Sequence, residues 1–423
     1  MRVLITSLAV EAHFNNTVPL AWALRAAGHE VHFASHPALT GTITDAGLVA
    51  VPVGTDHTHH DLVRDLGAEL TGFYRDIDVT GDRGGGYREL KGANTLLTAT
   101  FYAQANNDSM VDELVDYARF WRPDLIVWEP FTFAGAVAAR ATGAAHARLL
   151  WGPDLFLRTR RMFRQRTAEL PEERRDDALE EWLSWTLDRF GCSFDEEVVT
   201  GQWNIDQMPP SVRLDLGRPS VPMRYVPYNG PSVVPHWLRT PPDRPRVCLT
   251  LGITSRDLPY PNMVSLDQLF EAVAGLDAEI VATFDAGQLA GATRLPDNVR
   301  ATDFVPLQAL LPTCAAVVHH GGVGTWSTAA VCGVPQLVVA GMWDNVYRAR
   351  RLAERGAGIF LPPDELTPAA LRDGLEQLLT KPSFREEAHL LRTEIEAEPS
   401  PAAAVPAIAE LTARHRVPRP SSR

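Results

Sequence analysis

Short runs of apolar residues alternate with amphipathic segments through the first part of the chain. The runs predict strands at residues 3–7, 30–34, 125–128 and 146–150, and the segments predict helices at residues 16–27 and 133–142. Gly28 follows the first helix directly, where a glycine supplies the left-handed backbone that closes a helix. Repeated units of strand, helix and strand indicate a parallel sheet with helices on both faces.

Proline interrupts this alternation between residues 216 and 245, and the alternation then begins again. Eight prolines lie in that stretch, which predicts an extended linker. Beyond it, strands are expected at residues 247–251, 279–283, 315–319 and 336–339, and helices at 265–274 and 325–331. We therefore expect an α/β protein with two Rossmann-like, doubly wound domains, residues 1–215 and 246–385, that face each other across a cleft.

Length, charge and cysteine usage narrow the class of protein. With 423 residues, the chain exceeds what one compact core usually holds. Its net charge of −12 argues against nucleic acid or an anionic membrane as partner, because both attract basic surfaces. No run approaches the ~20 apolar residues of a membrane span, and the apolar N-terminus is too short for a signal peptide. The four cysteines are far apart, so we expect reduced thiols and a cytoplasmic location.

Two stretches carry charged or metal-binding side chains without a decisive pattern. Residues 158–191 have a helical period, with five arginines followed by an acidic run. They read either as two solvated amphipathic helices or as an insertion that contacts a partner or a bulky substrate. Among His57, His59 and His60, a helix could bring His57 and His60 together, but nothing completes a set of four metal ligands, so a solvated loop is expected.

The segment 317–328, Val-Val-His-His-Gly-Gly-Val-Gly-Thr-Trp-Ser-Thr, is the most informative part of the chain. It predicts a buried strand, a glycine-rich turn and the start of a helix. Such a turn directs backbone N–H groups at one point, where they bind an anion, and glycine lets a phosphate approach the backbone closely. His319 and His320 would add donors, so the segment predicts a phosphate or pyrophosphate site.

A dinucleotide-binding motif is an alternative interpretation of the same turn. Gly322-Val323-Gly324 resembles its beginning, and Asp344 lies about twenty residues further on, which would make the protein an NAD-dependent dehydrogenase. Against this, Ser327 stands where the motif has its third glycine. Two adjacent histidines also have no role in a dinucleotide loop.

A longer set of motifs resembles one enzyme family. The turn His319–Thr325 is followed by Gly333-Val334-Pro335-Gln336 and by Trp343-Asp344-Asn345; further matches lie at residues 18–31, 128–130, 149–154 and 223–230. Together they resemble the nucleotide-sugar-dependent glycosyltransferases of family 1, which have the GT-B fold. Within that family they are most similar to the desosaminyl and mycaminosyl transferases of macrolide antibiotic assembly.

The resemblance implies an inverting O-glycosyltransferase that moves an amino-deoxysugar from a dTDP-sugar to a macrolide aglycone. The same chemistry on an aromatic, anthracycline-type polyketide is the alternative, and a non-catalytic nucleotide-sugar-binding subunit is a reading from another class. The dTDP-sugar would be a co-substrate, with no cofactor and no metal. The resemblance also implies a haem-free, cytochrome-P450-like activator protein as partner and a C-terminal segment, residues 386–423, that returns to the first domain. The oligomeric state is left open, with a homodimer and a hetero-oligomer as the candidates.

The resemblance further assigns residues to the sugar donor. The diphosphate would lie against the turn, whose candidate donor-binding residues are His319, His320, Gly321, Gly322, Gly324 and Thr325. Phe304 takes the place of an aromatic residue that stacks on the base, and Asp344 and Asn345 match an acid–amide pair that meets sugar hydroxyls. Thr254 and Ser255 occupy a loop that faces the diphosphate.

His13 is the candidate catalytic base. It follows the first predicted strand, so it is expected to overlook the cleft, and it matches the position of the base in the family. A neutral imidazole there can take the proton from an acceptor hydroxyl. Glu129 is expected either to orient His13, as the acid of a base–acid pair, or to be a strand-end carboxylate in water. Asp154 is a second candidate for the orienting role. Aromatic residues of the first domain are expected to shape an apolar acceptor pocket: Phe73, Tyr74, Phe101, Tyr102, Trp151, Phe156 and Phe163.

Overall fold

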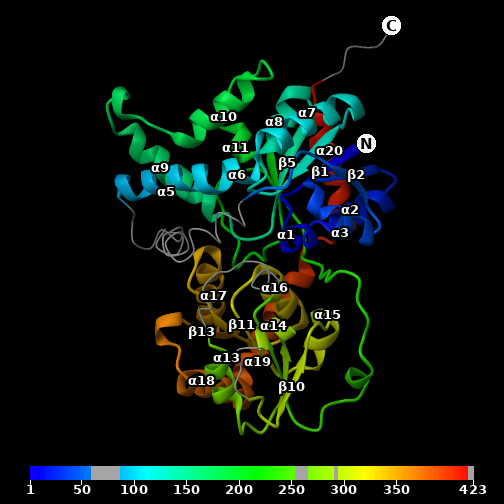
Figure 1. The fold of residues 1–423 in the computed structure, drawn as a ribbon, viewed down its shortest axis with the longest axis vertical. Coiled ribbons are helices and arrows are strands. Elements are labelled where there is room, and N and C mark those ends of the chain that lie inside the picture. Colours follow the sequence, from blue (N-terminus) through cyan, green and yellow to red (C-terminus); the bar gives the residue numbers. More distant parts are fainter. Residues whose placement is uncertain (59–85, 253–264, 290–293, 418–423) are drawn as a thin grey trace.

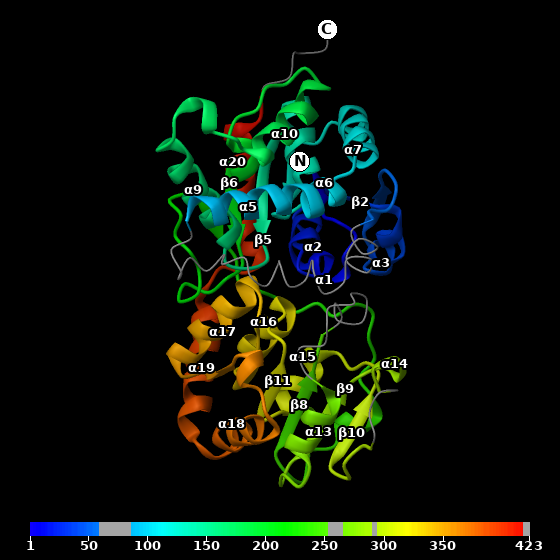
Figure 2. The same cartoon turned by 60° about the vertical axis from the view of Figure 1, so that its left-hand side comes forward.

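The chain folds into two lobes, each built around its own parallel sheet (Figures 1 and 2). The computed structural model describes residues 1–58, 86–252, 265–289 and 294–417. The first half of the chain forms one lobe and most of the second half forms the other. The predicted α/β class and the two-domain architecture are confirmed.

Within the described residues, the N-terminal sheet has seven parallel strands in the order β3-β2-β1-β4-β5-β6-β7. Their bounds are β1 Arg2–Thr6, β2 Glu30–Ser35, β3 Val49–Pro52, β4 Leu125–Trp128, β5 Ala145–Leu150, β6 Trp203–Asp206 and β7 Ser220–Pro222. The strand order reverses between β1 and β4. Open α/β sheets bind ligands beside such a reversal, at the carboxyl ends of the strands.

The C-terminal sheet repeats this plan, with the described strands in the order β10-β9-β8-β11-β12-β13. Their bounds are β8 Arg246–Thr250, β9 Glu279–Thr283, β10 Val299–Thr302, β11 Ala316–His319, β12 Gln336–Val339 and β13 Gly358–Leu361. Here the order reverses between β8 and β11. The glycine-rich turn follows β11 directly, so the turn also lies at a reversal point.

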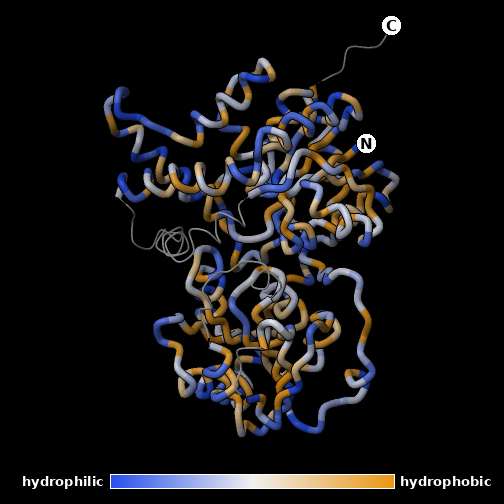
Figure 3. Tube along the Cα trace, viewed as in Figure 1, coloured by the Kyte–Doolittle hydropathy of each residue, from blue (hydrophilic) through white to orange (hydrophobic). Residues whose placement is uncertain are grey.

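The central strands are buried along their whole length, because helices cover both faces of each sheet. In β4, β8, β11 and β12 every residue is buried. Such strands are expected to be mainly apolar, and here the polar residues lie at strand ends: Arg246 and Thr250 in β8, His319 in β11 and Gln336 in β12. The hydrophobic parts of the trace gather inside each lobe (Figure 3). The apolar runs of the sequence therefore form the cores of the two lobes.

Helices complete both lobes. In the N-terminal half they are α1 Glu11–Asn15, α2 Val18–Ala26, α3 Thr40–Asp45, α5 Tyr87–Leu97, α6 Ala103–Ala105, α7 Asp108–Trp121, α8 Phe133–Thr142, α9 Leu155–Ala168, α10 Ala178–Asp188 and α11 Glu197–Thr200. In the second half they are α13 Leu266–Val273, α14 Ala286–Leu289, α15 Leu307–Leu310, α16 Val323–Cys332, α17 Trp343–Arg355, α18 Pro368–Thr380, α19 Pro382–Ala397 and α20 Pro401–His415. None of these combines the length and the apolar character that a membrane crossing requires.

The first predicted helix, residues 16–27, begins two residues later than expected and is preceded by a separate short helix. The side chain of Asn16 donates to the Ala12 carbonyl and the Thr17 hydroxyl donates to the Phe14 carbonyl, which ends α1 locally. Pro19 lies in the first turn of α2, where its missing N–H is tolerated. As a result His13 lies within α1.

The stretch 216–245 is not simply a linker. Residues 220–222 form β7, which pairs with β6 at the edge of the N-terminal sheet. Prolines are tolerated on an edge strand, because one side of that strand needs no ladder hydrogen bonds. The prolines therefore predicted the irregular backbone of this stretch, but they did not predict this strand.

The segment 386–423 divides between the lobes. Helix α19 stays with the C-terminal lobe, where Leu391 and Ile395 are buried in the core beside α16. Helix α20 packs against α2 and β5, and Ile408 is buried in the N-terminal core. The chain therefore crosses between the lobes at residues 398–400, later than the predicted boundary.

Candidate active site

His13 and Glu129 come from the ends of two paired strands. His13 lies in α1, which follows β1, and Glu129 directly follows β4, which pairs with β1. His13 Nδ1 lies 3.3 Å from Glu129 Oε2. An ionised carboxylate only accepts hydrogen bonds, so this contact assigns the proton of a neutral His13 ring to Nδ1 and leaves Nε2 with its lone pair. The structure thus brings the two candidate catalytic side chains together.

Glu129 is buried and densely hydrogen-bonded. Its side chain is 1% exposed. Oε2 also accepts from the backbone N–H of Phe131 and from Trp151 Nε1, each at 3.1 Å, and Oε1 accepts from the Thr132 hydroxyl at 2.5 Å. Burial alone would raise the pKa of Glu129, but the hydrogen bonds from His13, Thr132 and Trp151 and the charge of His13 hold it below its ordinary value. The interpretation of Glu129 as a carboxylate in water is therefore wrong.

Asp154 has a different role from the one considered for it. Its two carboxylate oxygens accept from Arg148, at 3.3 and 2.5 Å, and one of them also caps α9 by accepting from the backbone N–H of Leu157. The pair is buried. Asp154 therefore neutralises Arg148 and begins a helix, and the prediction that it orients His13 is wrong.

A series of contacts between aromatic rings connects His13 with the C-terminal lobe. The His13 ring centroid lies 5.3 Å from that of Trp151 and 5.9 Å from that of Phe131. Phe131 packs edge-on against Phe156 at 4.7 Å, and Phe156 packs edge-on against Trp343 of the C-terminal lobe at 5.4 Å. Trp343 has a φ of 48°, which is strained for a bulky side chain, and it begins α17.

The aromatics predicted to shape an acceptor pocket separate into three groups. Phe101, Tyr102, Trp151 and Phe156 belong to the apolar cluster beside His13. Phe163 instead stacks on Tyr87, with ring centroids 6.3 Å apart. Phe73 and Tyr74 lie outside the described residues.

The glycine-rich turn connects β11 to α16. Gly321 has a φ of +90°, and a Cβ there would lie 3.0 Å from the Asn345 Cβ. Gly322 is the N-cap of α16 and no side chain caps this helix, so its first N–H groups can take an anion. A Cβ on Gly322 would lie 2.9 Å from His320 Nε2. Glycine at these two positions therefore provides the backbone conformation and keeps the space above the helix end open.

Two further positions of the turn lie inside α16. Thr325 is 7% exposed in its first turn. The Gly324 carbonyl accepts from the Thr328 hydroxyl at 2.6 Å and from the Tyr225 hydroxyl at 3.4 Å. Tyr225, from the proline-rich stretch, thus supports the helix start, a contact that the spacing of residues in the sequence did not indicate.

His319 does not point at a ligand. The side chain is 1% exposed, Nδ1 accepts from the Gly321 backbone N–H at 3.0 Å, and Nε2 lies 2.8 Å from Gln336 Oε1. Burial, together with the neighbouring His320, lowers the pKa of His319 to about 3. The prediction that this side chain binds the donor is therefore wrong: it is a neutral ring that fixes the turn.

His320 remains available to a ligand. Within the described residues its Nδ1 is buried and has no hydrogen-bond partner. Burial and the nearby cation of Arg348 lower the pKa of His320 to about 4, so the ring is neutral at pH 7 and donates through one nitrogen. An unpaired buried nitrogen next to a helix N-terminus is a suitable contact for a phosphate oxygen.

Asp344 and Asn345 contact an arginine that the sequence analysis did not single out. Arg348, fully buried, forms an ion pair with Asp344 and donates to Asn345 Oδ1 at 2.8 Å and to the Gly321 carbonyl at 2.7 Å. Its spacing of four residues from Asp344 on one helix was the signal that could have indicated it. The acid–amide pair is thereby fixed to the glycine-rich turn.

The two halves of the site meet at the boundary between the lobes. A Cβ on Gly152, next to Trp151, would lie 3.0 Å from Asp344 Oδ2 and 3.1 Å from Arg348 Nη1. Helices α1 and α16 face each other across this boundary in both views (Figures 1 and 2). The surroundings of His13 and those of the turn are therefore in contact.

The structure describes only some of the remaining candidate residues. Phe304 follows β10 in an exposed loop, 42% exposed, so its ring is free to stack on a planar group. Thr254 and Ser255 lie outside the described residues, as do His59 and His60. His57 packs edge-on against the buried His36, with ring centroids 5.0 Å apart.

The chain is similar to known proteins over nearly its whole length. The chain matches the family descriptions "Erythromycin biosynthesis protein CIII-like" for the N-terminal domain, over residues 22–252, and for the C-terminal domain, over residues 267–411. It is 56% identical to the TDP-daunosamine transferase of Streptomyces peucetius, with 99% of this chain and 98% of that protein covered. It is 53% identical to the 10-deoxymethynolide desosaminyltransferase of Streptomyces venezuelae, with both chains covered completely.

A solved structure supports the same conclusion. The glycosyltransferase VinC, crystallised in complex with dTDP, is 43% identical and superimposes with a TM-score of 0.87 over 98% of this chain and 100% of that one. With two matched domains and relatives of this identity, the chain belongs to the erythromycin biosynthesis protein CIII-like family of GT-B glycosyltransferases, enzymes of antibiotic biosynthesis.

Proposed function

We propose that this enzyme transfers an amino-deoxysugar from a dTDP-sugar to a hydroxyl of a macrolide aglycone, with inversion at the anomeric carbon. The observation that carries the proposal is the pairing of His13 with a buried carboxylate beside the glycine-rich turn of the opposite lobe. One lobe supplies a base and the other an anion site. That is the arrangement which displacement of a nucleoside diphosphate by a hydroxyl requires.

Each step of the transfer has a group to perform it. His13 Nε2 takes the proton of the acceptor hydroxyl while the hydroxyl oxygen bonds to the anomeric carbon. Glu129 stabilises the imidazolium that forms on His13. The bond from that carbon to the diphosphate oxygen breaks. The first N–H groups of α16 and the His320 ring then bind the charge on the departing diphosphate.

Donor recognition follows from the positions around the turn. Phe304 would stack on the thymine base, and Asp344 and Asn345 would face the sugar. The relatives named above are daunosamine and desosaminyl transferases, and VinC was solved with dTDP. These names support a dTDP-linked amino-deoxysugar as the donor here.

An aromatic polyketide acceptor is the second candidate. It is favoured by the similarity, at 55% identity, to the aklavinone 7-beta-L-rhodosaminyltransferase of Streptomyces galilaeus, a value close to the 53% for the 10-deoxymethynolide desosaminyltransferase. Phe131, Trp151 and Phe156 form an aromatic cluster beside His13, against which the planar rings of such an acceptor would pack.

The deciding experiment is incubation of the purified enzyme with dTDP-amino-deoxysugars and a matched set of macrolide and anthracycline aglycones. Product masses identify the acceptor, and each reaction is run with and without cytochrome-P450-like activator proteins, which we also propose as partners. A macrolide glycoside as the main product supports the first candidate and an anthracycline glycoside the second. Hydrolysis of donor without any glycoside, under all conditions, would contradict both.

We further propose that the transfer needs no divalent cation, because the helix N-terminus and His320 can take the diphosphate charge. Treatment with EDTA should then leave the rate unchanged. A rate that is lost with EDTA and restored by Mg²⁺ would overturn this proposal.

A further inference from the structure

A pocket of about 310 Å³ lies on the N-terminal lobe and is lined by residues that the candidate active site does not use. Helix α9 contributes Arg161 and Arg164. Glu196, Glu197 and Thr200 come from α11 and the residue before it, and Arg218 comes from the segment that precedes β7. Three guanidinium groups from two separate parts of the chain therefore surround one small space.

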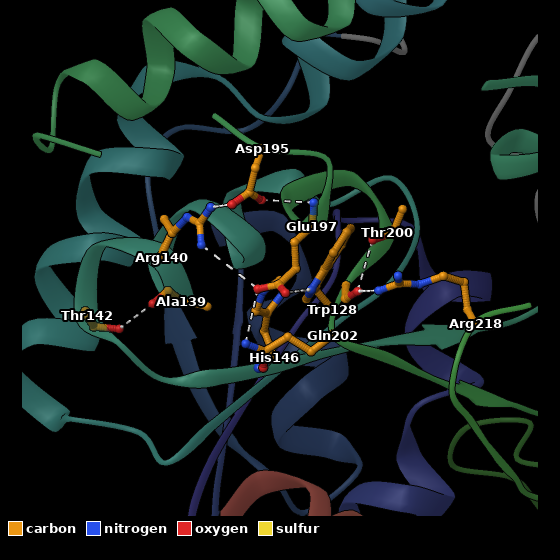
Figure 4. A network of polar contacts seen from close by, with 11 residues as sticks. Trp128, Ala139, Arg140, Thr142, His146, Asp195, Glu197, Thr200, Gln202 and Arg218 are labelled. Atoms are coloured by element: carbon orange, nitrogen blue, oxygen red, sulfur yellow. Dashed lines mark hydrogen bonds and ion pairs between the residues drawn. The ribbon is translucent and has the colours of Figure 1, made fainter. Parts of the chain in front are cut away.

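The two carboxylates of the pocket already have cationic partners. Glu196 pairs with Arg160 and with Arg164, each at 3.0 Å. Glu197 accepts from Gln202 at 3.2 Å and lies 3.6 Å from His146 and 4.0 Å from Arg140 (Figure 4). Both carboxylates therefore form their ion pairs with side chains other than Arg161 and Arg218.

Arg161 and Arg218 lack such partners. Among the described residues neither guanidinium has a carboxylate within ion-pair distance; Arg161 donates to the Leu216 carbonyl and Arg218 donates to the Gly201 carbonyl at 2.6 Å. Each guanidinium has five N–H donors, so these contacts leave most donors unused. Within the part of the chain that the structure describes, the buried Nε of Arg218 has no hydrogen-bond acceptor.

The electrostatics of the pocket favour an anion. Burial, and then the positive charges of Arg148 and Arg161, lower the pKa of Arg218, and the smaller influence of the Glu197 charge, which raises it, does not offset them. Two neighbouring cations without a counter-ion repel each other, and a ligand of charge about −2 would balance them. A tetrahedral oxyanion can accept from guanidinium groups that approach from different sides.

We propose that this pocket is a binding site for a phosphate group, either as inorganic phosphate or as the phosphoryl group of a small organic molecule. Arg161 and Arg218 would bind its oxygens directly. Arg164 lies at the edge, where Glu196 already engages it. The site is separate from the turn that would bind the diphosphate of the sugar donor.

Isothermal titration calorimetry on the full-length enzyme tests the proposal. The protein is first saturated with dTDP, so that the donor site is occupied, and is then titrated with inorganic phosphate or with glycerol 3-phosphate at constant ionic strength. We expect a single binding event. Arg161→Gln and Arg218→Gln should each weaken it at least tenfold, because each removes one of the two unneutralised cations. The ligand with the lower Kd identifies the source of the phosphate group.

The matched control is Arg166→Gln, which removes an exposed arginine of the same helix, paired with Glu169 at 3.6 Å, outside the pocket. This variant should bind phosphate like the unchanged enzyme. All variants should keep their dTDP affinity, which shows that they are folded. No binding heat beyond that of a matched chloride titration, or unchanged binding in both pocket variants, would overturn the proposal.

Discussion

Burial distinguishes the two residues to which we assign the catalysis. Glu129 is buried and accepts hydrogen bonds from several donors, so it stays charged, whereas His13 keeps part of its ring exposed, with 22% of the side chain accessible. A base must reach its substrate, but its charge partner need not. The adjacent histidines differ in the same manner: His319 has both nitrogens engaged and His320 keeps one without a partner in the described structure.

His13→Ala should lower kcat by roughly 10²–10⁴-fold, the usual contribution of a general base. Its affinity for dTDP should stay unchanged, because the donor site lies on the other lobe. Steady-state kinetics and calorimetry with dTDP measure the two effects separately. Glu129→Gln serves as the companion variant and should also lower kcat with dTDP binding intact. Equal losses of rate and of dTDP affinity in His13→Ala would show that its assigned role is wrong.

Acid should destabilise the protein through its buried histidines. The pKa of His319 is lowered to about 3, so between about pH 6.5 and pH 3 the unfolded chain binds a proton that the folded chain does not. Stability from this residue is therefore full above pH 6.5 and is lost as the pH falls; at pH 5 the loss is about 2 kcal/mol.

Urea denaturation at pH 7 and pH 5 measures this effect. His319→Asn should be less stable than the unchanged protein at pH 7, because the ring packs in the core. Its further loss between pH 7 and pH 5 should be smaller, because one titrating group is absent. An identical pH dependence in both proteins would mean that His319 does not titrate in this way.

The glycine-rich turn is held in position by the elements of structure around it. The turn after β11 needs a left-handed residue at Gly321, a helix that starts without a side-chain cap at Gly322, and Arg348 of α17 to bind the Gly321 carbonyl. Three elements therefore define the position of a few backbone N–H groups. Rigid elements of this kind hold a binding site more accurately than a free loop does.

Gly321→Ala should damage both stability and donor binding. The left-handed φ and the close Asn345 Cβ together should cost about 1–3 kcal/mol of folding free energy. Displacement of the turn should also weaken dTDP binding at least tenfold. Thermal unfolding and calorimetry with dTDP measure these two quantities.

Gly275→Ala is the control, because Gly275 has a φ of +74° in the same lobe with open space around it. This variant should lose stability from the backbone conformation alone and keep its dTDP affinity. If both variants bind dTDP equally well, the turn is not the diphosphate site.

At the scale of the whole molecule, the proposed active site lies where the described parts of the two lobes touch. The contact includes the edge-on pair of Phe156 and Trp343 and the proximity of Gly152 to Asp344. Helix α20 fastens the end of the chain to the N-terminal lobe after α19 has packed on the C-terminal one. The chain thus crosses between the lobes twice, which restrains how they approach each other.

A double-mutant cycle of Phe156→Leu and Trp343→Leu should detect the interlobe contact during turnover. Aromatic pairs of this geometry contribute about 0.5–1.5 kcal/mol beyond their burial. The effects of the two changes on kcat/KM should therefore be less than additive by roughly that amount. Strictly additive effects would indicate that the two rings do not meet in the productive complex.

The sequence by itself determined the fold class, eight of the thirteen described strands and the glycine-rich turn. It did not predict β3, β6, β7, β10 and β13, and it left two interpretations of Glu129 open. Parallel strands that are buried on both faces consist mainly of apolar residues, and a glycine-rich turn before a helix is typical of few other structures. Both features can therefore be recognised from short stretches of the sequence. The edge strand β7 was hidden among prolines, because the pairing of an edge strand depends on a neighbour distant in sequence.

Only the tertiary structure decided which polar side chains are free to act. His319 and Asp154 looked like site residues, yet their partners Gln336 and Arg148 lie on other elements. Tyr225 was missed because it lies 99 residues before Gly324 in the chain, whereas Arg348 was missed although it lies four residues after Asp344 on one helix. Which hydrogen bonds a side chain makes depends on how the elements pack against one another, and the sequence pattern does not show that packing.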